Sequence, residues 1–248
     1  MKYIFELEFT IKTIDEIVNS VIFNDSSKDF KMLVTTNLDH IVMMSNNKSF
    51  KHACERAWIV TADGFPVYRF LKLLGHDAKG RITGADLFPL IMSKLSPIEH
   101  SPFFVVSSED TKRVLVDWLV KHDFSDSHCR VVVPPFGFEH ESIYSHELIN
   151  SINHLATTHL FMGVGAPKSE LWMDSHRNFL KGVKGFGFGA GIDFYAGTMK
   201  RAPLWMQTSG LEWFYRLSSE PRRLAKRYLF SSWMFLFIAT KEYIKLKK

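Results

Sequence analysis

Asp63 is the residue of this chain best placed for acid–base chemistry. It follows a short apolar run and precedes Gly64, so a tight turn there could bring a ligand close to the carboxylate. A carboxylate in such a turn can act as a general base that removes a proton from a hydroxyl group. The alternative is a capping aspartate whose side chain holds the start of a helix predicted over residues 66–74.

A cation, a hydroxyl group and a carboxylate surround a glycine in residues 81–87. Arg81 could bind a diphosphate through two parallel N–H bonds, and Thr83 and Asp86 flank Gly84 at a predicted helix start. The alternative is a surface arginine followed by a threonine or aspartate N-cap. The spacing alone leaves both interpretations open.

Two glycine-rich segments later in the chain are typical of loops that hold phosphate groups. Residues 163–170 open a predicted helix, and the N–H groups of a helix start can bind an anion. Residues 185–193 also fit a relaxed dinucleotide-binding pattern, but no strand–helix–strand unit follows them, which disfavours a nicotinamide enzyme. The candidate ligand-binding residues of the two segments are Gly163, Gly165, Lys168, Glu170, Gly189 and Asp193.

The sequence offers no recognisable metal site. It contains no Asp-x-Asp pair, and its 11 histidines form no His-x-x-x-His array. His40 is interpreted as a hydrogen-bonded loop residue rather than a ligand. If a diphosphate has to leave, arginine, lysine and helix dipoles would have to offset its charge.

Composition indicates a globular protein of the cytoplasm. The 248 residues are 46% hydrophobic and 23% charged, and Cys54 and Cys129 are too far apart to suggest a disulfide framework. We expect no signal peptide, no spanning helix and no nucleic-acid partner. The net charge of +5 equals the contribution of one basic cluster, which consists of Arg216, Arg222, Arg223, Lys226 and Arg227.

Short β-branched or aromatic runs alternate with helical patterns, which predicts an α/β domain with a mainly parallel sheet and helices on both faces. Strands are expected at residues 3–9, 32–36, 58–61, 103–107, 130–134, 159–164 and 183–188. Helices are expected at residues 13–23, 48–57, 66–74, 84–95, 110–122, 142–155 and 168–180. Ligands of such sheets bind beyond the carboxyl ends of the strands, which singles out residues 35–40, 62–66 and 163–170.

The end of the chain combines positive charge with apolar surface. From about residue 200 a helical appendage is predicted, so that residues 1–199 form one domain and residues 200–248 the appendage. The basic cluster is followed by thirteen uncharged residues, 228–240, which suit an anionic membrane surface. The alternative is a C-terminal helix that simply packs on the core.

These motifs together resemble the WecG/TagA/CpsF family of bacterial glycosyltransferases, also known as glycosyltransferase family 26. The matching blocks stand in the family's order and cover roughly residues 30–228. They are residues 35–37, 62–64, 81–87, 163–170, 189–197, 200–203 and 210–223.

The resemblance implies a Rossmann-like domain and an inverting, metal-independent transfer of a sugar from a UDP-sugar, without a cofactor. The acceptor would be a polyprenyl-diphosphate-linked sugar at the inner face of the cytoplasmic membrane, in the synthesis of a cell-surface polysaccharide. The transfer would be of the N-acetylmannosaminyl or glucosyl type. The resemblance does not determine the donor sugar, and it leaves a homo-oligomer open.

The resemblance also assigns roles to residues. Asp63 falls where the family has its proposed catalytic base, with Thr35 and Asn37 beside it. Arg81 falls near the substrate, and the tail arginines match an appendage that closes over the site. The substrate-binding residues expected in all are Arg81, Thr83, Asp86, Gly163, Gly165, Lys168, Glu170, Gly189, Asp193, Arg216, Arg222 and Arg223.

Two departures from the family pattern bear on function. Ser169 stands where the family usually has glutamine, which affects donor contacts, and the tail is unusually apolar. Two other functions are compatible with the residues. One is a non-catalytic module that binds nucleotide-sugars or polyprenyl phosphates, and the other is a Rossmann enzyme such as a UDP-sugar epimerase, which would need NAD.

Overall fold

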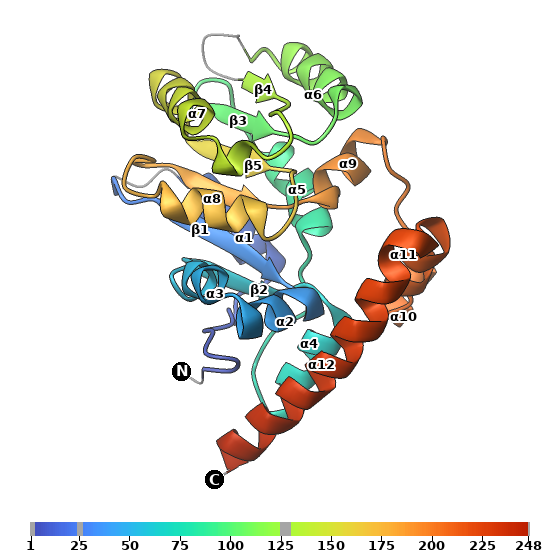
Figure 1. Cartoon of the computed structure of the whole chain (residues 1–248). Helices are drawn as coiled ribbons and strands as arrows, with labels where there is room; N and C mark the ends of the chain where they lie inside the picture. The colour runs from blue at the N-terminus through green and yellow to red at the C-terminus, as the bar shows by residue number, and fades with distance from the viewer. Residues whose placement is uncertain (1–2, 24–26, 125–129, 248) are drawn as a thin grey trace.

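A computed structural model describes residues 3–23, 27–124 and 130–247 of the chain, without the side chains of residues 223 and 226–228. Cys129 and the side chains of Arg223, Lys226 and Arg227 therefore lie outside the described residues. Figure 1 shows a central sheet with helices on both faces and a long C-terminal helix along one side.

The sheet has six parallel strands in the order β2-β1-β6-β5-β3-β4, as the predicted α/β class requires. Nearly all strand residues are buried, because helices cover both faces. The strands are β1 (Lys31–Thr36), β2 (Ile59–Ala62), β3 (Pro102–Val105), β4 (Arg130–Val132), β5 (His159–Met162) and β6 (Lys184–Gly187).

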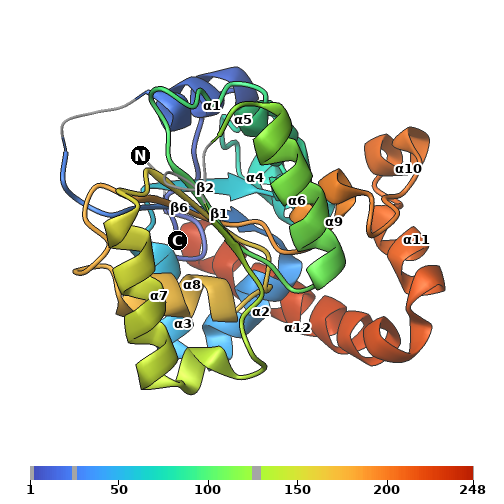
Figure 2. The same ribbon diagram turned by 90° about the horizontal axis from the view of Figure 1, so that it is seen from above.

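Two apolar layers hold the helices to the sheet. On one face, Phe104, Phe161 and Phe186 of adjacent strands stack with ring centroids 5.1 and 4.9 Å apart. The helices of this face are α1 (Ile14–Ile22), α5 (Gly84–Met92), α6 (Glu109–Lys121) and α9 (Ala190–Ala196). The opposite face carries α2 (Leu38–Asn46), α3 (Lys48–Glu55), α7 (Ser142–His154) and α8 (Lys168–Ser175), as Figure 2 shows. The apolar layer of that face also includes residues of α4 (Phe65–Leu73) and η1 (Phe138–His140).

The predicted strand over residues 3–9 is wrong. Phe5 and Glu6 have positive φ angles of 54° and 63°, which turn the chain so that Ile4 and Leu7 bond to each other. Only Phe9 reaches the sheet, through a single bridge to Val60. The other six strands are confirmed to within a few residues. Thr13 and Glu16 form a capping box at the start of α1.

Two helices beside the carboxyl edge of the sheet were not predicted. α2 begins after Asn37, whose side-chain oxygen accepts a hydrogen bond from the His40 N–H at 3.2 Å. α9 begins after Gly189, which has a φ of 49°. His40 therefore lies in a helix rather than in the loop that was expected.

The chain from residue 200 onward is helical, as predicted, and we call residues 200–247 the appendage. It consists of α10 (Leu204–Ser209), α11 (Glu212–Ser219) and α12 (Pro221–Lys247), and Pro221 is the first residue of α12. Among the residues that the structure describes, none of the helices has both the length and the apolar character needed to cross a membrane.

α12 combines a packed face with an exposed apolar face. It runs beside α2 (Figure 1), and Phe235 contacts the rings of Phe5 and Phe70 at 5.9 and 6.5 Å. Its exposed large apolar side chains include Leu229, Phe230, Trp233, Leu236 and Phe237. The packing interpretation of the tail is thus correct for one face and leaves the other face uncovered.

Candidate active site

The carboxyl ends of β1 and β2 bring Thr35, Asn37 and Asp63 together. The two strands pair in parallel up to Thr36 and Ala62, and the Asp63 N–H donates to the Thr36 carbonyl at 2.9 Å. Gly64 lies against Asn37, since a β-carbon on Gly64 would sit 3.4 Å from the Asn37 Cβ. These three candidate residues, far apart in sequence, therefore share one end of the sheet.

Asp63 does not cap a helix, so the capping interpretation is wrong. The N-cap of α4 is Gly64, and no side chain bonds to that helix start. Within the described chain, Asp63 makes hydrogen bonds through its backbone only. Burial raises the pKa of its carboxyl to about 6, although the nearby Arg81 cation lowers it. A carboxylate with this pKa can accept a proton at neutral pH.

Two buried side chains, those of His40 and Glu170, hold Asn37 in place. Its Oδ1 also lies 2.9 Å from Nδ1 of His40, and His40 Nε2 lies 3.7 Å from Oε1 of Glu170. Glu170 is buried, and Gly187 leaves room for it, because a β-carbon there would sit 2.5 Å from Oε1. Glu170 thus supports the Asn37 side of the site from inside the protein.

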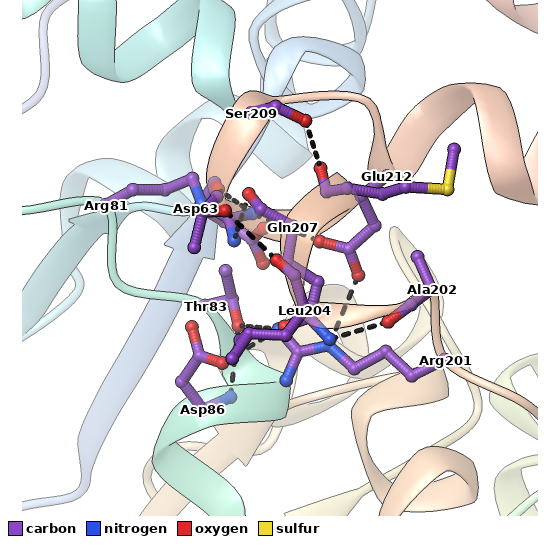
Figure 3. Close-up of polar contacts among 12 residues, drawn as sticks. Asp63, Arg81, Thr83, Asp86, Arg201, Ala202, Leu204, Gln207, Ser209 and Glu212 are labelled. Carbon is purple, nitrogen blue, oxygen red and sulfur yellow. Dashed lines mark hydrogen bonds and ion pairs between the residues drawn. The ribbon is translucent and has the colours of Figure 1, made fainter.

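Arg81 reaches from the core to the appendage (Figure 3). Its Nη1 lies 3.2 Å from Oε2 of Glu212, and Nη2 donates to the Gln207 carbonyl at 3.4 Å. The Arg81 side chain is only 16% exposed, which rules out the surface-arginine interpretation. Its guanidinium also lies 5.8 Å from the ring of Phe65, which stands two residues after Asp63.

Arg201 completes the network on the other side of Glu212. Its Nε lies 3.3 Å from Glu212 Oε1, and its Nη2 lies 2.7 Å from Asp86 Oδ1 and donates to Thr83 Oγ1 at 3.4 Å. Thr83 is the N-cap of α5 and accepts from the Asp86 N–H at 3.0 Å, so the capping interpretation holds for this residue.

Comparison with known proteins places this chain in a family. The sequence pattern of the glycosyl transferase WecG/TagA/CpsF family matches residues 2–248. The chain belongs to this family. It is also similar to proteins of Staphylococcus aureus strains MW2 and NCTC 8325 that are named N-acetylglucosaminyldiphosphoundecaprenol N-acetyl-beta-D-mannosaminyltransferase. The identity is 22% over 98% of this chain and 93% of each relative.

The two glycine segments of this WecG/TagA/CpsF protein meet at the same edge of the sheet. Gly163 and Gly189 are neighbours, because a β-carbon on Gly163 would lie 3.6 Å from the Gly189 carbonyl oxygen. Gly165 lies beside Gly189 as well. Ser169 is fully buried and donates to the Gly165 carbonyl at 3.3 Å, so it lies beneath the loop rather than in it.

Lys168 and Asp193 are already engaged within the protein. Lys168 Nζ lies 3.0 Å from Oε1 of Glu139, and Asp193 Oδ1 accepts from Thr111 Oγ1 at 2.7 Å. Burial raises the pKa of Asp193, while the Thr111 hydrogen bond lowers it. Asp193 therefore joins α9 to α6, and a contact of either residue with substrate stays a prediction.

The tail arginines differ from one another in position. Arg216 lies 5.6 Å from the Phe194 ring of α9, at the same edge of the sheet, whereas Arg222 is exposed. The Arg223 side chain lies outside the described residues. The structure thus brings Arg216 to α9 and leaves Arg222 at the start of α12, and a contact of either residue with substrate stays a prediction.

The sequence did not predict a functional role for three residues of the site. Arg201 and Glu212 lie inside matching blocks of the family but carried no assigned role, and His40 was interpreted as a loop residue. Two surface hollows, of about 440 and 450 Å³, lie elsewhere, between β4 and α7 and between α12 and the end of α2. Beside Asp63, the end of α10 and the turn that follows it instead lie against Arg81 and Phe65.

Proposed function

We propose that this chain transfers a sugar from a UDP-sugar to an undecaprenyl-diphosphate-linked N-acetylglucosamine, with inversion and without a metal ion. The observation that carries the proposal is the Asp63 carboxylate, which has a pKa of about 6 and stands beside the cationic Arg81. The activity named for the Staphylococcus aureus relatives supports this acceptor and suggests N-acetylmannosamine as the sugar.

In this reaction Asp63 takes the proton of the acceptor hydroxyl group. The hydroxyl oxygen then attacks the anomeric carbon, and the bond from that carbon to the diphosphate oxygen breaks, so that UDP leaves with the electron pair. Arg81 and the tail arginines, chiefly Arg216, offset the negative charge that develops on the diphosphate. The start of α8 adds backbone N–H groups.

The proposed place of action is the inner face of the cytoplasmic membrane, to which residues 200–248 would bind as an appendage of the catalytic domain at 1–199. Exposed aromatic side chains support this. Trp205 of α10 and Trp213 and Phe214 of α11 are exposed, as are the apolar side chains of α12. Lys241 and Lys245 lie further along α12, where an anionic leaflet would attract them.

The test is UDP release from a panel of UDP-sugars with a short-chain lipid acceptor. The wild-type chain should release UDP only when the acceptor is present, and Asp63→Asn should abolish this while leaving UDP affinity nearly unchanged. A chain that binds UDP-sugars but never releases UDP would instead be a binding module. Wild-type rates from Asp63→Asn would remove Asp63 from the mechanism.

A further inference from the structure

The Glu212 carboxylate joins two arginines that come from different parts of the chain. One oxygen pairs with Arg81 of the core and the other with Arg201, at 3.2 and 3.3 Å. The side chains of the three residues are between 16 and 19% exposed. A carboxylate in this position neutralises two partly buried cations whose planar groups suit a larger anion.

Arg201 has contacts besides Glu212 that keep it in place, whereas Glu212 stands on a helix that has no buried side chain. Arg201 is anchored to α5 through Asp86 and Thr83, independently of Glu212. Glu212 is the first residue of α11, and none of the eight residues of that helix is buried. A helix without buried side chains has little apolar contact area to hold it, so we expect that it can move away at a small cost in free energy. Arg201 would then still be held by Asp86 and Thr83, and Arg81 would keep its contact with the Asp63 carbonyl.

A diphosphate matches the vacated pair better than Glu212 does. It carries at least two negative charges and several oxygens, so each guanidinium can form parallel N–H bonds to it. Glu212 offers one oxygen to each arginine. The exchange of a carboxylate for a diphosphate therefore adds both charge and hydrogen bonds.

We propose that Arg201 and Arg81 together bind a diphosphate group, and that Glu212 occupies their site in the free protein. This inference deepens the proposed function, on which it rests, and adds Arg201 as a binding residue and Glu212 as a competing internal anion. Both the donor and the acceptor of that reaction contain a diphosphate, and the experiment distinguishes them.

The test is calorimetric titration of the full chain with inorganic pyrophosphate, UDP, UMP and farnesyl diphosphate. Glu212→Gln should tighten pyrophosphate binding about tenfold, on the order of one charge-assisted contact. Arg201→Gln should weaken it and should cancel the gain in the double variant. Glu147→Gln is the matched control, because Glu147 is exposed on α7, and it should bind pyrophosphate as the wild type does.

If Glu212→Gln binds UDP more tightly than the wild type does, but not farnesyl diphosphate, the site belongs to the donor. If it binds farnesyl diphosphate more tightly, but not UDP, the site belongs to the acceptor. The affinity for UMP, which has a single phosphate, should change little in either variant. Pyrophosphate should also speed hydrogen exchange in α11, since Glu212 is released. A folded Glu212→Gln variant with unchanged or weaker pyrophosphate binding would overturn the inference, as would a double variant that keeps the full gain.

These outcomes separate the inference from the proposed function. If the variants bind pyrophosphate as expected but no sugar is ever transferred, the site stands and the proposed reaction fails. If sugar is transferred and neither variant changes diphosphate binding, the reaction stands and the roles of Arg201 and Glu212 are refuted.

Discussion

The α-carbon of Gly210 packs against the ring of Phe65, so closely that a β-carbon on Gly210 would lie 2.9 Å from the ring Cγ. Gly210 forms the turn between α10 and α11, and Phe65 opens α4 two residues after Asp63. The appendage is therefore seated directly on the segment that carries the proposed base.

Gly210→Ala should weaken the packing of the appendage on Phe65 and lower kcat/KM several-fold, as measured by UDP release. The added methyl group would meet the Phe65 ring, and a φ of 79° costs alanine about 1 kcal/mol. Gly197→Ala is the control, because its φ is 73° but no atom lies within 4 Å of the added carbon. Equal losses in the two variants would contradict a role for the Phe65 contact.

Activity should rise with pH through the pKa of Asp63. The proposed base must be ionised, and burial raises its pKa to about 6, so kcat/KM should fall about tenfold per pH unit below that value. Because the negative charge of Glu212 also raises this pKa, Glu212→Gln should move the midpoint to lower pH. A pH–rate profile checks both points, and a wild-type midpoint near pH 4 would contradict the raised pKa of Asp63.

Asp63→Asn should make the protein more stable at pH 7.5. The carboxyl has an ordinary pKa of 3.8 and a folded-state pKa of about 6, so the folded state binds its proton more tightly. Its stabilising contribution is complete below pH 3.8 and is lost as pH rises through 6. Asparagine avoids that loss, and the free energy of unfolding should increase by roughly 3 kcal/mol at pH 7.5.

Urea titrations at pH 7.5 and pH 4 measure this difference, which should almost disappear at the lower pH. A variant that is less stable than the wild type at pH 7.5 would show that the Asp63 carboxylate stabilises the fold rather than straining it.

Asn37→Ser should separate the capping role of Asn37 from its role in the site. Serine is also a good N-cap, so the melting temperature should stay near that of the wild type. The loss of the amide should nevertheless lower kcat, measured by UDP release. Asn37→Ala should lose the cap as well, at a cost of about 1 kcal/mol. If Asn37→Ser keeps the wild-type kcat, Asn37 acts only as the N-cap of α2 and has no role in the reaction.

Trp233→Ser combined with Phe237→Ser should weaken binding to anionic lipid vesicles by about tenfold or more, because each large apolar side chain contributes roughly 2 kcal/mol when buried. Co-sedimentation measures the effect. Phe179→Ser is the control, since Phe179 and Phe237 are both 55% exposed. An equal loss in the control would argue against membrane docking through α12.

Truncation of the tail is a poor substitute for these substitutions. Phe235 and Ala239 are buried, and Glu242 accepts a hydrogen bond from the Phe5 N–H at 2.9 Å. Removal of residues 228–248 would therefore open the core as well as remove the lipid-facing side chains.

Local patterns predicted the sheet and the position of Asp63 well. Buried parallel strands are continuous apolar runs, and the turn residues Asp63 and Gly64 end one of them. The capping box at Thr13 is likewise a signal within four residues. Such signals depend only on neighbours in the chain, so they can be found without knowledge of the fold.

The contacts that define the site depend on distant residues instead. Arg81 and Glu212 are 131 residues apart, and no spacing rule connects them. Residues 5–9 alternate apolar side chains with glutamates, a pattern that predicted an extended strand, yet Phe5 and Glu6 have positive φ angles. Residues 35–40 looked like a loop because they are polar, yet Asn37 starts a helix there.

The position of β6 has a consequence for how the protein is made. β6 lies between β1 and β5, so residues 184–187 must leave the ribosome before the two half-sheets can join. Until then β1 and β5 each present an unpaired edge that other chains can pair with. The sheet can therefore be completed only when most of the chain has been synthesised. We expect the nascent polypeptide to fold late and to depend on chaperones during translation.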